Sequence, residues 1–193
     1  MTLPSHFTSL AGCTFRLLRA LLASCFWFFC GVLYPRAKKR VSHLKMPIPE
    51  FDEHGLLPIG VHDCTAAEVA ARFGVFQGNE QRPRLMAKLT DFLKEVRASG
   101  IVREVFVDGS FVTEEPSPND IDLIVVLPST HDHAADLLPL QYNVVSRKRV
   151  RSRFGFDTVS VRQCTTEHAA SIEFFQQVRG EPGLRKGILR LTP

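Results

Sequence analysis

The sequence lacks the cysteine spacing that is typical of small zinc or redox domains. It has five cysteines and no Cys-x-x-Cys pair, which argues against a zinc ribbon or a redox motif and favours free thiols in a reducing compartment. It also has no internal repeat and no low-complexity run, so nothing indicates a repeat architecture. These absences leave an ordinary globular protein, and 193 residues are enough for one domain with a hydrophobic core.

Acidic residues are absent from the first 45 positions, which contain seven basic ones. The rest of the chain therefore holds 17 of the 24 basic residues and all 20 acidic residues, so its formal charge is −3, although the whole sequence carries +4. A mildly acidic folded part argues against a general nucleic-acid binder, and we expect no DNA partner.

The longest apolar run, over residues 20–34, is shorter than the ~20 residues that a membrane-spanning helix needs. Basic residues flank it on both sides, and no clear signal-peptide cleavage site precedes the second basic cluster. We interpret residues 1–45 as a misplaced upstream start or a dispensable extension, followed by a cytoplasmic domain over residues 46–193. The alternative is a membrane anchor through residues 20–34, which applies only if residues 1–45 are translated.

Hydrophobic periodicity and turn residues predict an α+β domain with a small mixed sheet flanked by helices. Thr65 and Glu68 form a capping-box pattern ahead of a helix. Pro139 argues against one continuous helix over 136–150, a segment that stays ambiguous. The predicted elements are an extended arm over 47–60, helices over 66–73, 83–98 and 166–178, strands over 101–107, 121–127 and 154–161, and an edge strand over 187–191.

The most informative pattern is a strand that enters a Gly109-Ser110 turn, followed by a second strand that carries Asp120 and Asp122. Side chains alternate along a strand, so the two carboxylates point to one side, with Cα atoms about 6.5–7 Å apart. Two carboxylates on one face of a buried strand repel each other and are costly to desolvate. The usual reason to tolerate that cost is a bound divalent cation, so the pattern predicts a metal site.

This Gly-Ser and Asp-x-Asp pattern resembles the signature of the nucleotidyltransferase superfamily, which has the DNA polymerase beta-like fold. The size of the chain is similar to that of the small bacterial members, the minimal nucleotidyltransferases. Residues 46–191 also resemble an uncharacterised bacterial family with Gly-Ser-Phe-Val-Thr at the turn (here 109–113) and Lys-Gly-Ile near the C-terminus (here 186–188).

The superfamily resemblance implies a role for each matching residue. It implies that Asp120 and Asp122 hold Mg²⁺, with two ions expected, and that a third carboxylate comes from a neighbouring strand. Asp157 is the best candidate for that third carboxylate and for the base that acts on the acceptor hydroxyl. The backbone amides of Gly109 and Ser110 would bind the triphosphate of a nucleoside triphosphate (NTP) substrate.

Structural explanations stand beside these roles. Asp120 follows Pro118-Asn119 and fits a turn aspartate, Asp157 fits a solvated strand residue, and Gly109-Ser110 fits an ordinary turn. Asp122 is harder to explain in this way, because it interrupts an apolar run.

Two charged segments complicate the resemblance. Minimal nucleotidyltransferases often carry a basic residue soon after Gly-Ser, and here Glu114-Glu115 stands instead. The basic cluster over 147–153 is either the source of the missing cations or a solvated face, which is the commoner meaning of such a run. We interpret His131-Asp132-His133 as a loop and Lys186 as a strand start rather than a catalytic lysine.

The sequence thus predicts an Mg²⁺-dependent nucleotidyltransferase that moves a nucleoside monophosphate from an NTP to a protein or RNA hydroxyl. The resemblance suggests a toxin–antitoxin or defence setting, with a toxin or antitoxin partner or a homodimer. The alternative is a catalytically inactive module that keeps the fold and acts through a protein partner. Glu114-Glu115 favours this alternative, and the retained Asp-x-Asp disfavours it.

Overall fold

The computed structural model describes residues 48–75 and 77–193, so the predictions for residues 1–45 lie outside the described residues. No helix among the described residues is long and apolar enough to cross a membrane. The elements are β1 (Val61–Cys64), α1 (Ala66–Phe73), α2 (Gln81–Ser99), β2 (Glu104–Asp108), the 3₁₀ turn η1 (Ser110–Val112), β3 (Asp122–Leu127), α3 (Pro139–Val145), α4 (Arg147–Phe154), β4 (Asp157–Arg162), α5 (Thr166–Phe175) and β5 (Ile188–Leu191).

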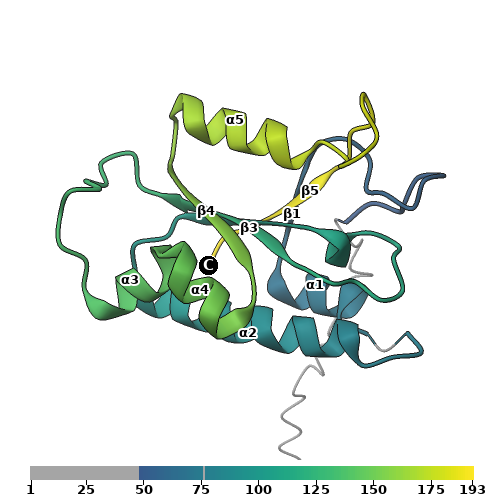
Figure 1. Ribbon diagram of the computed structural model, residues 1–193, viewed down its shortest axis with the longest axis horizontal. Helices are drawn as coiled ribbons and strands as arrows, with labels where there is room; N and C mark the ends of the chain where they lie inside the picture. The colour runs from purple at the N-terminus through teal and green to yellow at the C-terminus, as the bar shows by residue number, and fades with distance from the viewer. Residues whose placement is uncertain (1–47, 76) are drawn as a thin grey trace, which may run out of the picture. The chain divides into compact units, whose positions relative to one another are not determined.

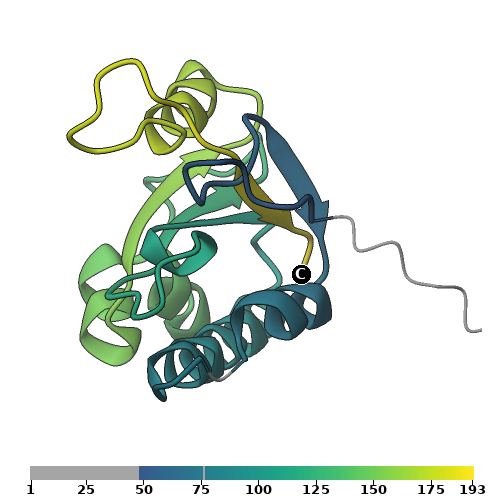
Figure 2. The same ribbon diagram turned by 90° about the vertical axis from the view of Figure 1, so that its right-hand side faces the viewer.

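The strands form one mixed sheet with helices on both faces. Its order is β1-β5-β2-β3-β4, in which β2 runs antiparallel to β5 and β3, whereas the β1–β5 and β3–β4 pairs are parallel. Figure 1 shows α5 alone on one side of the sheet and α1, α2, α3 and α4 on the other, and Figure 2 shows the same layers from the side. The predicted α+β class with a mixed sheet is confirmed at this level.

Local signals place several helix ends where the sequence predicts them. The side chain of Thr65 accepts a hydrogen bond from the Glu68 amide, and Glu68 accepts one from the Thr65 amide, so the predicted capping box begins α1. Pro139 is the first residue of α3, a position where its missing N–H group costs nothing. The ambiguous segment 136–150 therefore contains the whole of α3 and the start of α4.

Four predictions of secondary structure are wrong. Residues 61–64 form strand β1, which the sequence reading missed, and β5 lies between β1 and β2 instead of at an edge. Residues 154–156 do not belong to a strand, because α4 continues to Phe154 and β4 begins at Asp157. Helix α5 ends at Phe175, so Val178 lies outside the helix, whereas the predicted inner residues Ile172 and Phe175 are partly buried and pack against a hydrophobic cluster.

Alternating residues of the central strands supply two separate hydrophobic clusters. Leu123, Val125 and Leu127 pack with α1, α2, α3 and α4, in a large cluster that includes Phe92 and Phe154. Ile124 and Val126 point to the other face, where they form a small cluster with Phe106, Val161 and Ile188, against the partly buried inner side of α5. Asp122 shares the face of Ile124 and Val126, because side chains two residues apart lie on the same side of a strand.

Candidate functional site

Three aspartates lie in one row across three neighbouring strands. Asp108 ends β2 opposite Asp122, the first residue of β3, and Asp122 lies opposite Asp157, the first residue of β4. Residues that face each other in a register share one face of the sheet, with Cβ atoms about 4.5–5.5 Å apart in an antiparallel pair. We call Asp108, Asp122 and Asp157, together with the neighbouring Asp120, the carboxylate row. The sequence analysis named all of them except Asp108.

Asp120 is held by the Gly-Ser turn and lies just before β3, not inside it. The Ser110 hydroxyl donates a hydrogen bond to Asp120 Oδ1 at 2.6 Å, and the Ser110 amide donates a second one at 3.0 Å. Burial works to raise the pKa of Asp120, but these hydrogen bonds and the charges of Lys186 and Arg179 together lower it. Asp120 is therefore ionised at neutral pH and points at the turn.

Gly109 brings the turn close to the start of β3. Its φ of +92° lies in the region that favours glycine, and a Cβ atom there would meet Asp120 O at 3.0 Å and Asp122 N at 3.1 Å. The Phe111 amide also donates a hydrogen bond to Asp120 O. A glycine at this position lets the two backbone segments touch, which is what fixes the Gly-Ser turn beside the carboxylate row.

Asp122 is the central carboxylate, and among the described residues its side chain makes no hydrogen bond or ion pair. Burial raises its pKa, and the negative charges of Asp120 and Asp157 raise it further. The positive charges of Lys186 and Arg179 act in the opposite direction. An unpaired carboxylate among other carboxylates is a place where a cation gains the most electrostatic energy.

Asp108 and Lys186 form a buried ion pair that the sequence analysis did not predict. Lys186 Nζ lies 2.8 Å from Asp108 Oδ1, and the two side chains are 12% and 7% exposed. Burial raises the pKa of Asp108 to about 6, although the charge of Lys186 lowers it. Lys186 does precede a strand, as predicted, but its side chain enters the candidate site.

Asp157, at the other end of the row, is paired with two arginines of α4. Arg151 Nη1 donates to Asp157 Oδ1 at 3.0 Å, and Arg147 Nη2 donates to the same oxygen at 3.3 Å. These three side chains are 42–68% exposed, so the ion pairs are open to solvent and each contributes little to stability. Part of the basic cluster over 147–153 thus lies at the site and is not merely a solvated face.

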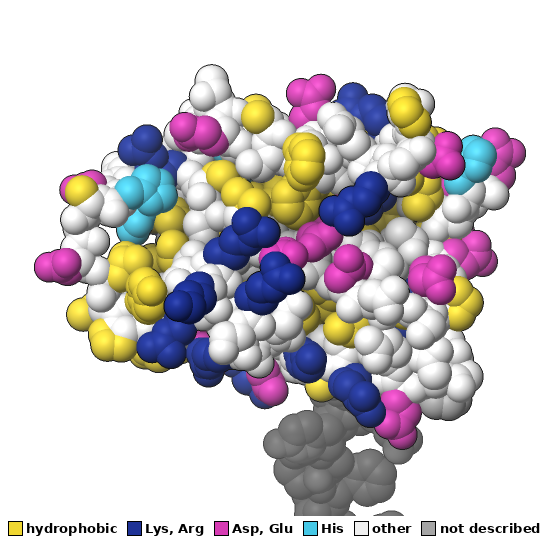
Figure 3. Space-filling model, in the orientation of Figure 1, with side chains coloured by type: hydrophobic (Ala, Val, Ile, Leu, Met, Phe, Trp, Pro, Cys, Tyr) yellow, Lys and Arg dark blue, Asp and Glu magenta, His cyan; other side chains and the backbone are white. Residues whose placement is uncertain are grey.

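Cations therefore stand on both sides of the carboxylate row. Arg147 and Arg151 lie at its β4 end, while Lys186 and Arg179, from the segment between α5 and β5, act on Asp120 and Asp122. Figure 3 shows acidic side chains near the middle of this face with lysine and arginine side chains around them. Such an arrangement can hold a metal ion at its centre and anionic groups around it.

A buried arginine of α2 holds the loop that joins the Gly-Ser turn to Asp120. Arg82, on α2, is 1% exposed. Its guanidinium donates hydrogen bonds to the backbone carbonyls of Phe111 at 2.9 Å and Thr113 at 2.7 Å, and also to those of Phe73 and Glu115. Nothing in the sequence distinguishes Arg82 from a solvent-exposed helix arginine, because its burial depends on where the fold places the backbone carbonyls that it contacts.

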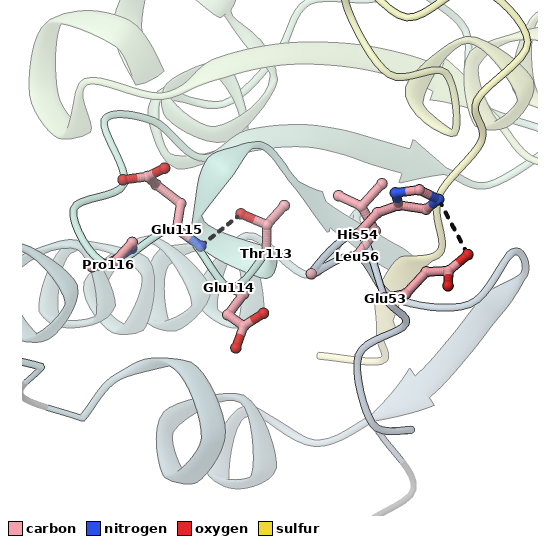
Figure 4. Close-up of a pocket in the computed structure, with 8 residues that line it drawn as sticks. Glu53, His54, Leu56, Thr113, Glu114, Glu115 and Pro116 are labelled. Atoms are coloured by element: carbon pink, nitrogen blue, oxygen red, sulfur yellow. Dashed lines mark hydrogen bonds and ion pairs between the residues drawn. The ribbon is translucent and has the colours of Figure 1, made fainter.

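Glu114 and Glu115, which stand where a basic residue is common, line a separate pocket of about 430 Å³ (Figure 4). The Glu114 amide donates a hydrogen bond to Gly55 O, which joins the two loops that form the pocket walls. No member of the carboxylate row lines it, so the glutamates do not crowd the row itself. The other lining residues are Glu53, His54, Gly55, Leu56, Thr113 and Pro116.

The donor set suits a hard divalent cation, because Mg²⁺ prefers carboxylate oxygens and keeps several waters. As the described side chains stand, no three acidic, histidine or cysteine side chains converge closely enough to hold a metal ion. The reason is visible in the row: Asp108 points at Lys186, Asp120 at Ser110 and Asp157 at the two arginines. Asp122 and Asp120 remain the pair that fits an ion best.

Comparison with known proteins gives one family and no characterised relative. Residues 49–192 match the model of a family of unknown function, DUF6932. No curated protein and no solved structure matches the chain.

Proposed function

The chain belongs to the DUF6932 family of unknown function, and we propose that it is an Mg²⁺-dependent nucleotidyltransferase with a nucleotidyltransferase-like fold. It moves a nucleoside monophosphate from an NTP to a hydroxyl group of a protein or RNA acceptor. One observation carries the proposal: the carboxylate of Asp122, which has no partner among the described side chains, lies beside Asp120, which the Gly109-Ser110 turn holds in place.

Asp120 and Asp122 are the residues that would hold magnesium. When bound, Mg²⁺ supplies charge neutralisation for the phosphoryl oxygens of the triphosphate. Asp120 is kept ionised by Ser110, and Asp122 sits among negative charges that a cation relieves. Ionised carboxylates bind the metal directly, so the local electrostatics support this role.

The triphosphate would lie at the side of the carboxylate row near Asp120, where the Gly109-Ser110 turn and the cations Lys186 and Arg179 act. Gly109 is buried and brings the turn against the start of β3, and the hydroxyl of the partly exposed Ser110 can reorient from Asp120 toward a phosphate oxygen. Arg179 is exposed and close enough to lower the pKa of Asp120. It supplies the positive charge that the sequence lacks directly after Gly-Ser.

Asp157 lies at the acceptor end in this proposal. It is half-exposed and stands next to Asp122 in the register, so an acceptor hydroxyl can approach it from solvent. Arg147 and Arg151 orient its carboxylate and add positive charge for an anionic acceptor. Asp157 then accepts the hydroxyl proton as the acceptor oxygen bonds to the α-phosphorus and the bond to the leaving pyrophosphate breaks.

The experiment is calorimetric titration of the full chain with each NTP, with and without Mg²⁺, and a comparison with Asp122→Asn. We expect metal-dependent binding of at least one NTP in the wild type and its loss in the variant. Asp91→Asn is the matched control, because Asp91 is an exposed residue of α2 that pairs with Lys94 away from the row. Unchanged binding in Asp122→Asn would show that the metal site is assigned wrongly.

A catalytically inactive module that binds a protein partner is the second candidate. It is favoured by the cations already paired with Asp108 and Asp157, and by the lack of a preformed three-ligand site among the described side chains. Such a module would bind no NTP with or without Mg²⁺, and a stable partner, such as a toxin or antitoxin, would co-purify with it. A cytoplasmic location is part of the proposal for either candidate, and the partner is either a toxin or antitoxin or a second copy of the chain.

A further inference from the structure

Lys186 is placed by backbone contacts on both of its sides. Its amide donates a hydrogen bond to Gln176 O at 2.8 Å, and the next amide, of Gly187, donates one to Leu57 O at 2.8 Å. Gly187 packs so closely that a Cβ atom would lie 2.2 Å from Pro58 O. The backbone that carries Lys186 is therefore fixed, and its side chain enters the site from a rigid support.

The ammonium of Lys186 serves more than one carboxylate. It contacts Asp108 at 2.8 Å, and its charge lowers the pKa values of both Asp120 and Asp122. The side chain is only 12% exposed, so water screens this charge less than it would at the surface. Lys186 thus acts electrostatically as a resident cation at the β2 end of the row.

The position of this cation matters because Asp108 and Asp122 face each other across adjacent strands. Facing carboxylates on neighbouring strands are close enough for one ion to bridge them. In this protein the place beside Asp108 is taken by a lysine. At the opposite end of the row, Arg147 and Arg151 form ion pairs with Asp157, as Lys186 does with Asp108.

We propose that Lys186 substitutes for a second metal ion, so that the site binds a single divalent cation, on Asp120 and Asp122. This inference rests on the proposed function, because it concerns the metal of that same site, and it differs from the two ions that the superfamily resemblance implies. A second divalent ion beside Asp108 would lie next to a buried ammonium, and like charges at such distances repel strongly where water is excluded.

The test counts bound Mn²⁺, used alone as the probe, by electron paramagnetic resonance of the full chain at pH 8. We expect one Mn²⁺ per chain in the wild type. Lys186→Met frees the Asp108 carboxylate, so we expect two per chain in that variant. In Asp108→Asn with Lys186→Met the freed carboxylate is also removed, and the count should return to one.

Two ions in the wild type, or one ion in Lys186→Met, would overturn the inference. A wild-type count of two overturns the inference even if Lys186→Met fails to fold, which its circular dichroism spectrum would reveal. No bound Mn²⁺ in the wild type would overturn the inference, whereas the proposed function is decided separately by the NTP titration with Mg²⁺. One bound Mn²⁺ without any NTP binding would support the single-metal site while the proposed function fails, so the two failures are distinguishable.

Discussion

The two faces of the sheet are built from the same strands but differ in the polarity of their side chains. The face toward α1, α2, α3 and α4 is entirely apolar over β3, with Leu123, Val125 and Leu127 all 0% exposed. The face toward α5 is apolar over Ile124 and Val126 and then changes to aspartate at the strand end. Helix α5 covers the apolar part with partly buried side chains.

The difference between the two faces explains how this small domain tolerates four clustered carboxylates. The large cluster on one face contains most of the buried apolar residues of the two clusters, so the other face can carry charged residues at one end without the loss of the main core. The carboxylates also sit at strand ends, where backbone turns and loops from elsewhere bring cations to them. Stability and chemistry are therefore separated by the alternation of side chains along β3.

The largest expected effect comes from breaking the apolar face. Phe92, on α2, is fully buried, and its ring centroid lies 5.5 Å from that of Phe154 and 6.2 Å from that of Phe156. Phe92→Ala removes these contacts and leaves a cavity, so we expect a loss of about 3–5 kcal/mol in the free energy of unfolding. Urea denaturation of the full chain measures it.

Phe174→Ala is the control for the opposite face. Phe174 belongs to α5 and is 68% exposed, so its removal should change the free energy of unfolding by less than about 0.5 kcal/mol. Equal losses in the two variants would contradict the division of roles between the faces.

Arg82 connects the apolar face to the site, and its replacement should have the next largest effect. Arg82→Met leaves the buried carbonyl of Phe111 and the partly buried carbonyls of Thr113 and Glu115 without their donor. We expect a loss of about 3–4 kcal/mol in the free energy of unfolding, since each unsatisfied group costs about 1–3 kcal/mol and the partly buried ones can bond to water. Arg82→Lys should recover only part of it, because one ammonium cannot reach carbonyls that a planar guanidinium spans.

Thermal and urea unfolding measure this effect, with Arg84→Met as the matched control. Arg84 is on the same helix, its side chain is 65% exposed, and among the described residues it pairs only with Glu80. A loss in Arg84→Met as large as that in Arg82→Met would show that the helix, and not the carbonyl contacts, is responsible.

Local and periodic signals were enough to predict much of the fold. The capping box at Thr65, the helical periodicity over 83–98 and the apolar run after Asp122 each act within a few residues, and each predicted its element correctly to within a few residues. The strand β1 was missed because it has four residues with no clear alternation, and its existence depends on β5, over 120 positions away. The same pairing places β5 inside the sheet, which no local pattern could indicate.

The candidate site divides in the same way. Asp120 and Asp122 were identified because their spacing is local, and Asp157 was found by its place at a strand. Lys186 and Asp108 were not, because their ion pair joins residues that only the sheet order brings together. Arg82 was also missed, since a charged residue on a helix is usually solvent-exposed and here it is buried by its carbonyl partners.

The smallest expected effect is a pH dependence that comes from the charged end of the α5 face. The pKa of Asp108 is raised from 3.8 to about 6 in the folded chain, so the folded state holds the proton more tightly than the unfolded state. The stabilisation is therefore complete below pH 3.8 and is lost as the pH rises through about 6. At about 1.4 kcal/mol per pKa unit, the free energy of unfolding should fall by about 2–3 kcal/mol across this interval.

Asp108→Asn removes the titrating group, and comparing it with the wild type isolates this term from the other carboxylates. We expect urea denaturation at pH 4, 5, 6 and 7 to show a difference between the two proteins that changes from pH 4 to 6 and is then constant. A constant difference over the whole range would mean that Lys186 holds Asp108 ionised throughout, with its pKa near the unfolded value. The same ion pair carries the proposal of a single-metal site. The titration therefore also separates the carboxylate row, whose stability should depend on pH, from the apolar face, which should respond little to pH.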